Sequence, residues 1–179
     1  QFQAAALGAL SKHGKHYRPL LTVLVYLALT ESSKIPAWVD RIAIAVECFH
    51  KASLIHDDIE DGDDYRYGEE TIHHQLGVPI AINVGDYLIG MGYRLVSRES
   101  RTLGSEVVSD ILDSLASAHI KLTEGQGAEL SWRDSRDRPL QPIDALKIYA
   151  LKTAPAFEAA ILTGIRLATS HQPYLAPVK

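Results

Sequence analysis

Residues 38–61 show helical spacing along their whole length, and the middle of this stretch, IAIAVECFHKASLI, is apolar on nearly every side. Such a pattern implies burial among other helices rather than on one face of a sheet. Period-two alternation bounded by hairpin turns is scarce in the rest of the chain, whereas helical spacing is common. We therefore predict an all-α fold built as a helix bundle.

The same periodicity divides the remaining chain. After a short opening helix, the expected helices are 19–30, 38–61, 71–76, 78–97, 104–131 and 142–169. A polar loop, GDDYRYGEE, and a charged connector, RDSRDRPLQP, interrupt the series. Nothing in the composition marks a second domain, and 179 residues that are 46% hydrophobic can bury one core. We expect residues 1–179 to form a single helical domain.

Composition also excludes some classes of protein. The formal net charge of −4 gives no reason to expect a nucleic-acid partner. The longest charge-free apolar run, PLLTVLVYLALT, is too short to cross a bilayer, so we expect no transmembrane segment. The single cysteine, Cys48, excludes an internal disulfide framework. It favours a reducing compartment, and we expect a cytoplasmic protein.

The stretch SLIHDDIED places four acidic residues directly behind the apolar helix. At about 100° per residue, Asp57 and Asp61 lie within roughly 20° of the direction of His50, so the three share one stripe. Asp58 lies about 80° away, but can lean toward Asp61 as an i,i+3 neighbour. Carboxylates on one stripe repel one another, and near a buried cleft their pKa values rise unless a cation lies between them.

Several interpretations of this acidic cluster compete. One is a solvated helix end with no ligand. A calcium loop fails, because counting from Asp57 the third ligand position is Ile59 and the twelfth is Gly68. A Mg²⁺ site fits oxygen ligands without cysteine, and Mg²⁺ keeps positions for water and substrate phosphates. A phosphohydrolase built on His56 and Asp57 is a further alternative, although no other histidine pair is spaced to complete it.

A phosphate-binding site also needs cations, and the chain has them at three places. Lys12, Lys15 and Arg18 precede an apolar helix, where basic side chains and a helix N-terminus favour anions. Arg66 lies in the polar loop. Lys152 lies in YALKTAPAF, shortly before a proline that we expect to kink its helix.

Five segments together resemble a known family, the trans-type isoprenyl diphosphate synthases (polyprenyl synthetases). The segment HKASLIHDDIED resembles the family's first aspartate-rich motif, DDxxD. The others, in the family's order, are GKHYRP, DDYRYGEETIHHQLGVPIAINVGDYL, EGQGAEL and LKTA. The likeness covers the N-terminal two-thirds of the family's pattern. It implies an antiparallel helix bundle around a deep central cavity, working as a homodimer.

The resemblance further implies a transferase that condenses isopentenyl diphosphate with an allylic prenyl diphosphate. The resemblance assigns Mg²⁺ binding to Asp57 and Asp61. It places Asp58 and Lys152 with them as catalytic residues. The residues that it assigns to the allylic diphosphate are Arg66, Gln126, Lys152 and Thr153. Those that it assigns to isopentenyl diphosphate are Lys15, Arg18 and His50.

The chain departs from the family's pattern at four points. Tyr67 stands where a second arginine is usual, His13 where a glycine is usual, and Glu129 where aspartate is frequent. No second DDxxD occurs in these residues, so we expect the 179 residues alone to be inactive. Either a C-terminal part of the full protein supplies that motif, or the chain is a non-catalytic or regulatory prenyl-diphosphate-binding subunit of a heteromeric synthase.

Overall fold

The computed structural model describes residues 2–11, 14–133 and 141–168. Within them, the helices are α1 (Phe2–Ser11), α2 (Tyr17–Thr30), α3 (Ala37–Asp61), α4 (Ile72–Leu76), α5 (Val78–Ser97), α6 (Ser100–Leu103), α7 (Ser105–Arg133) and α8 (Pro142–Ala168). Two short antiparallel strands, β1 (Tyr65–Arg66) and β2 (Glu69–Glu70), follow α3. The predicted all-α fold is confirmed. Among the described helices, none is long and apolar enough to span a membrane.

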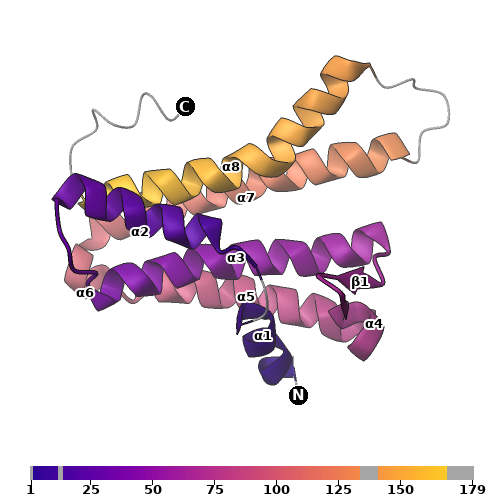
Figure 1. Cartoon of the computed structure of the whole chain (residues 1–179), viewed down its shortest axis with the longest axis horizontal. Helices are drawn as coiled ribbons and strands as arrows, with labels where there is room; N and C mark the ends of the chain where they lie inside the picture. Colours follow the sequence, from indigo (N-terminus) through magenta and orange to yellow (C-terminus); the bar gives the residue numbers. More distant parts are fainter. Residues whose placement is uncertain (1, 12–13, 134–140, 169–179) are drawn as a thin grey trace.

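The long helices form two antiparallel pairs. Helix α3 packs along α5, α7 packs along α8, and α2 contacts both α3 and α8 (Figure 1). The short helix α1 lies against α5 and α3. The chain between α3 and α5 contains the β1–β2 hairpin and α4. This arrangement brings the C-terminal end of α3 to the same end of the molecule as the C-terminal end of α7 (Figure 1).

Helix α3 lies at the centre of the fold, as its apolar pattern predicts. Its first half joins a core cluster with side chains from α2, α5, α7 and α8, and its second half joins another with α1 and α5. Val39, Ile42 and Ala45 are completely buried. Removing apolar surface from water on several sides of one helix accounts for the near absence of a polar face in its middle.

The structure differs from the predicted elements mainly in the polar loop. Residues 65–70 form a hairpin whose turn residues, Tyr67 and Gly68, have φ values of 56° and 82°. Positive φ at both central residues is typical of tight hairpin turns. Strands of two residues carry no alternation to detect, so the sequence predicts only a loop. Helix α6 was likewise not predicted, and most of the charged connector lies outside the described residues.

Helix α8 continues through Pro155, and Figure 1 shows that it is bent. Proline removes one backbone donor and crowds the preceding turn, which bends the helix without ending it. The predicted kink is therefore observed. Lys152 lies one turn before the proline, on the part of α8 that packs near the end of α7.

Candidate diphosphate and metal site

The acidic cluster lies at a well-formed helix end. Gly62 ends α3 with φ 69°, its N–H bonds to the carbonyls of Asp58 and Ile59, and Asp63 N–H bonds to the Asp58 carbonyl at 2.9 Å. A left-handed glycine with such bonds satisfies the last carbonyls of a helix. The cluster is also only partly solvated, since Asp58 is 5% exposed. Both observations argue against a frayed, solvated helix end.

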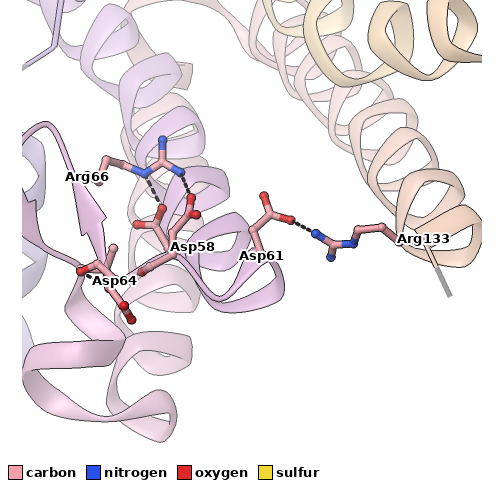
Figure 2. A network of polar contacts seen from close by, with 7 residues as sticks. Asp58, Asp61, Asp64, Arg66 and Arg133 are labelled. Atoms are coloured by element: carbon pink, nitrogen blue, oxygen red, sulfur yellow. Dashed lines mark hydrogen bonds and ion pairs between the residues drawn. The ribbon is translucent and has the colours of Figure 1, made fainter.

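Asp58 is bound to the hairpin. The Arg66 guanidinium forms an ion pair with the Asp58 carboxylate (Figure 2). It also lies 3.6 Å from the Asp63 carboxylate. Burial raises the pKa of Asp58, and the bond from Arg66 opposes that rise. Asp58 therefore fixes Arg66 beside the end of α3.

Asp57 occupies a different environment from its neighbour. Burial raises its pKa to about 6, with the charges of Glu60 and Asp61 acting in the same direction. The charges of Lys152 and Arg66 lower that pKa. Asp57 is thus within electrostatic reach of Asp61 on its own helix and of the lysine on α8. These are the residues that the sequence predicts to share one site.

Asp61 forms an ion pair with a residue of α7. The Arg133 guanidinium lies 2.9 Å from its carboxylate and donates a second bond, of 3.0 Å, to the Glu60 carbonyl (Figure 2). Sequence reasoning missed Arg133, which is the last residue of α7. No local signal identifies it, because 72 residues separate the partners.

Lys152 and its neighbours form the wall opposite α3. The lysine Nζ lies 2.7 Å from a carboxylate oxygen of Glu129 on α7. Gln126, one turn earlier on α7, is buried, and both atoms of its amide lack a hydrogen-bond partner among the described residues. Thr153 is half-buried beside Lys152. An unsatisfied buried amide is costly unless a ligand or water completes it, so this wall suits a polar ligand.

Two of the residues predicted to bind the second diphosphate, Arg18 and His50, form a separate centre. Arg18 Nη1 lies 3.0 Å from His50 Nε2, and the Arg18 guanidinium lies 4.5 Å from the centre of the Phe157 ring. Burial lowers the pKa of His50 to about 3, and the charges of Arg18, Lys51, Arg66 and His16 act in the same direction. His50 is therefore neutral and accepts the bond from Arg18. Lys15 is exposed, with its ammonium 5.7 Å from the centre of the Tyr17 ring.

Two further buried charges lie next to this centre. Glu47 is 6% exposed, and its carboxylate lies 3.0 Å from His16 Nδ1 and 4.0 Å from Lys51 Nζ. Lys51 is also 6% exposed. The i,i+4 spacing of a glutamate and a lysine inside an apolar helix was a detectable signal that sequence reasoning did not use.

The donor set fits a metal ion that takes few protein ligands. Among the described residues, no three His, Cys, Asp or Glu side chains converge on one point. A closed protein cage is therefore not formed here. Mg²⁺ is commonly bound through one or two carboxylates, with substrate phosphates and water completing its shell. The pair formed by Asp57 and Asp61 meets that requirement, whereas His56 turns toward α5, with Nε2 3.8 Å from Asp86.

Known proteins resemble this chain over most of its length. The polyprenyl synthetase family model matches residues 1–178. The short chain isoprenyl diphosphate synthase of Methanocaldococcus jannaschii is 32% identical over 169 residues, which are 90% of this chain and 48% of that protein. The geranylgeranyl diphosphate synthase of Sulfolobus acidocaldarius is 33% identical over 127 residues, or 71% of this chain and 38% of that protein.

A solved structure gives the same result. The geranylgeranyl pyrophosphate synthetase from the archaeon Geoglobus acetivorans superposes with a TM-score of 0.87 at 26% identity, covering 99% of this chain and 56% of that one. The chain therefore spans between 38% and 56% of the length of these three proteins.

Proposed function

We propose that this chain, which belongs to the polyprenyl synthetase family, is the part of a Mg²⁺-dependent prenyltransferase that binds the two substrates of chain elongation. Those substrates are isopentenyl diphosphate and an allylic prenyl diphosphate, and the product is a longer linear isoprenyl diphosphate. The observation that carries the proposal is that Asp57 lies within electrostatic reach of both Asp61 on its own helix and Lys152 on α8. Paired carboxylates facing a lysine suit a metal-bridged diphosphate.

The allylic diphosphate would lie between the end of α3 and the wall formed by α7 and α8. Asp57 and Asp61 would hold Mg²⁺, which when bound supplies positive charge that stabilises the departing diphosphate. Lys152 and Thr153 would bind the phosphate oxygens directly. Gln126 would complete its unpaired amide with the same group. Fixed donors aimed at developing negative charge need no reorganisation when the bond to the allylic carbon breaks.

Asp58 would act through Arg66 rather than on the substrate. Its carboxylate holds the guanidinium beside the metal-binding pair. The remaining guanidinium N–H groups can then face the diphosphate. This gives Asp58 a positioning role, which differs from the catalytic group in which the resemblance places it.

Isopentenyl diphosphate would bind at the centre formed by Arg18 and His50, with Lys15 contributed by the segment before α2. His50 contributes by accepting the bond from Arg18, which orients the guanidinium while adding no charge of its own. The buried Arg18 Nε, which lacks a partner among the described residues, offers a further donor. A guanidinium donor without a protein partner suits a phosphate oxygen.

Each of the relatives reported above bears a synthase name, which favours a synthase over a non-catalytic binding subunit. We further propose that the full protein works as a homodimer, which light scattering on the purified protein would test. The cytoplasmic location expected from the single cysteine stays a prediction.

The test is an elongation assay on the full-length protein with Mg²⁺, labelled isopentenyl diphosphate and several allylic primers. We expect longer prenyl diphosphates from at least one primer, and none when Asp57 and Asp61 are both changed to asparagine. Asp113→Asn is the matched control, because Asp113 lies in a separate hollow of about 500 Å³ between α5 and α7. Phosphate release without elongation, or binding without turnover, would contradict the proposal. The 179 residues assayed alone should give no product.

A further inference from the structure

Lys51 is a buried cation in the middle of an otherwise apolar helix. Only 6% of it is exposed, although lysine is among the residues least often buried. Its ammonium lies 4.0 Å from Glu47, and 3.4 Å from the point where a Cβ on Gly14 would be. The side chain therefore extends toward the segment between α1 and α2, which carries Lys15 and leads into Arg18. Burial is the main cause that lowers the pKa of Lys51.

Lys51 lines a small cavity together with other charged side chains. A cavity of about 70 Å³ is bounded by Lys51 and Asp58 from α3 and by the hairpin residues Arg66, Tyr67, Glu69 and Glu70. Thr71 and apolar residues of α1, α3 and α4 complete it. Pockets for drug-sized ligands have volumes of about 300 Å³ or more. This cavity therefore suits a compact polar group rather than a prenyl chain.

The charges that act on His50, one residue before Lys51, are all positive. Among the carboxylates that line the cavity, Glu69 and Glu70 are exposed, and the buried Asp58 is paired with Arg66. The charges of Arg18, Lys51 and Arg66 all act on His50, which places the three cations around one side chain. Like charges held together in a partly buried site favour an anionic ligand that lowers their repulsion.

Tyr67 lies where this cluster meets solvent. It is 63% exposed, its φ of 56° is fixed by the hairpin turn, and its electrostatic effect reaches Arg18. The resemblance implies an arginine at this position. A phenol supplies one hydroxyl donor and no positive charge at neutral pH, so position 67 leaves the cluster one cation short of that pattern.

We propose that Lys51 is a further substrate-binding residue, whose ammonium binds the diphosphate of isopentenyl diphosphate from inside the bundle and replaces the charge that Tyr67 does not supply. This inference rests on the proposed function for the name of the substrate. The chemistry, which is recognition of a diphosphate, follows from the cations around His50. A lysine acts as a compact point charge, so it can serve this role from α3 without the planar geometry of an arginine.

The test compares Lys51→Met with Lys51→Arg in the full-length protein, each with and without Tyr67→Arg. We expect Lys51→Met to raise KM for isopentenyl diphosphate at least tenfold and KM for the allylic diphosphate less than twofold. Lys51→Arg should stay within threefold of the wild type for both substrates. Adding Tyr67→Arg to Lys51→Met should recover most of the loss. An unchanged KM for isopentenyl diphosphate, or an equal rise for both substrates, would overturn the proposal.

Lys51→Met leaves Glu47 without its buried cation, so the variant could be unstable for that reason alone. The double variant Lys51→Met with Glu47→Gln removes both charges together and is compared with Glu47→Gln alone. The same selective rise in KM is expected across that pair. If the two proteins have equal KM for isopentenyl diphosphate, Lys51 is a structural residue only.

Calorimetry with inorganic diphosphate, without metal or allylic substrate, separates this proposal from the proposed function. We expect Lys51→Met to weaken binding at least tenfold. Loss of diphosphate affinity in a protein that elongates no primer would support the anion site and reject the prenyltransferase. If the protein elongates a primer and Lys51→Met binds diphosphate as tightly as the wild type, the prenyltransferase is supported and the role of Lys51 is rejected.

Discussion

Asp57 and Asp58 are adjacent in the chain, but the fold gives them different partners. Asp58 is buried against Arg66, and the pair fastens the hairpin to α3. Asp57 lies close to other carboxylates and to Lys152, and its raised pKa shows that its charge is poorly compensated without a ligand. A cation bound beside Asp57 would remove that penalty. This difference is the residue-level basis for assigning metal binding to Asp57 and positioning to Asp58.

Asp57→Asn should stabilise the metal-free protein above pH 6. A carboxyl whose pKa rises from 3.8 to about 6 on folding contributes stability that is fully present below pH 3.8 and is lost as the pH rises through 6. Asparagine carries no such dependence. After allowing for solvent screening, we expect a gain of about 1 kcal/mol in the free energy of unfolding at pH 7.5. Urea unfolding with chelator at pH 7.5 and pH 4 measures it, and a variant that is less stable at pH 7.5 would contradict this account.

His50→Gln should change how stability depends on pH. The folded state holds His50 neutral down to about pH 3, whereas the unfolded state protonates it near 6.5. Its contribution to stability is therefore lost as the pH falls below 6.5, by at most about 1.4 kcal/mol per pH unit. The stability of the wild type minus that of the variant should fall between pH 7 and pH 4.5. A difference that stays constant over this range would show that folding leaves the pKa of His50 unchanged.

Arg133→Ala should free Asp61 at little cost. The ion pair is partly exposed, with 39% of the arginine side chain and 27% of the aspartate side chain accessible, so its loss should cost less than about 1 kcal/mol. Without this competing cation, we expect Mg²⁺ to bind two- to fivefold more tightly in the presence of an allylic diphosphate. Lys121→Ala, which removes an ion pair with Glu158 from the same helix, is the control. Equal Mg²⁺ affinity in wild type and Arg133→Ala would mean that Arg133 does not compete for Asp61.

At the scale of elements, the contact between α7 and α8 positions Lys152. A Cβ on Gly125 would lie 2.8 Å from Leu151 Cβ, 2.9 Å from the Leu151 carbonyl carbon and 2.9 Å from Lys152 N. The absence of a side chain at this position lets α8 approach α7 closely enough to bring the lysine toward Asp57. A glycine on α7 is thus part of the geometry of the site without touching a substrate.

Gly125→Ala and Gly127→Ala should have opposite effects. The first forces backbone of α8 away, and overpacking of this kind costs about 1–3 kcal/mol. A Cβ on Gly127 meets nothing within 4 Å, so the second should stabilise the helix by about 0.5–1 kcal/mol. Denaturant unfolding of the full-length variants measures both, and KM for the allylic diphosphate should rise only for Gly125→Ala. Effects of the same sign on stability would refute this role for the glycine.

The sequence predicts the long helices well because their apolar periodicity reflects burial, as in α3 and α5. It also places Asp57 and Asp61 on one stripe, since that depends on helix geometry alone. The hairpin escaped prediction because two-residue strands have no periodicity. The contacts of Asp61 with Arg133 and of Lys152 with Glu129 escaped because sequence spacing carries no information about which distant helices meet. Candidate residues could be named from the sequence, but the ion-pair partners that those residues have in the structure could not.

At the scale of the whole molecule, two antiparallel helix pairs meet with α2 between them, and the candidate site lies where α3 faces the end of α7 and the bent α8 (Figure 1). Acidic side chains come from one pair, and Lys152, Gln126 and Thr153 come from the other. The basic centre of Arg18 and His50 joins α2 to α3. Under the proposed function, these two centres would hold the two diphosphates side by side, as the joining of two prenyl units requires.

The most direct test of this account measures how Mg²⁺ changes the affinity of the full-length protein for an allylic diphosphate in the absence of isopentenyl diphosphate. Calorimetric titrations with and without Mg²⁺ would compare the wild type, the variant with both Asp57→Asn and Asp61→Asn, and the control Asp113→Asn. We expect Mg²⁺ to strengthen binding at least tenfold in the wild type and the control, and less than twofold in the double variant. Full Mg²⁺ enhancement in the double variant would contradict the claim that these two carboxylates hold the metal.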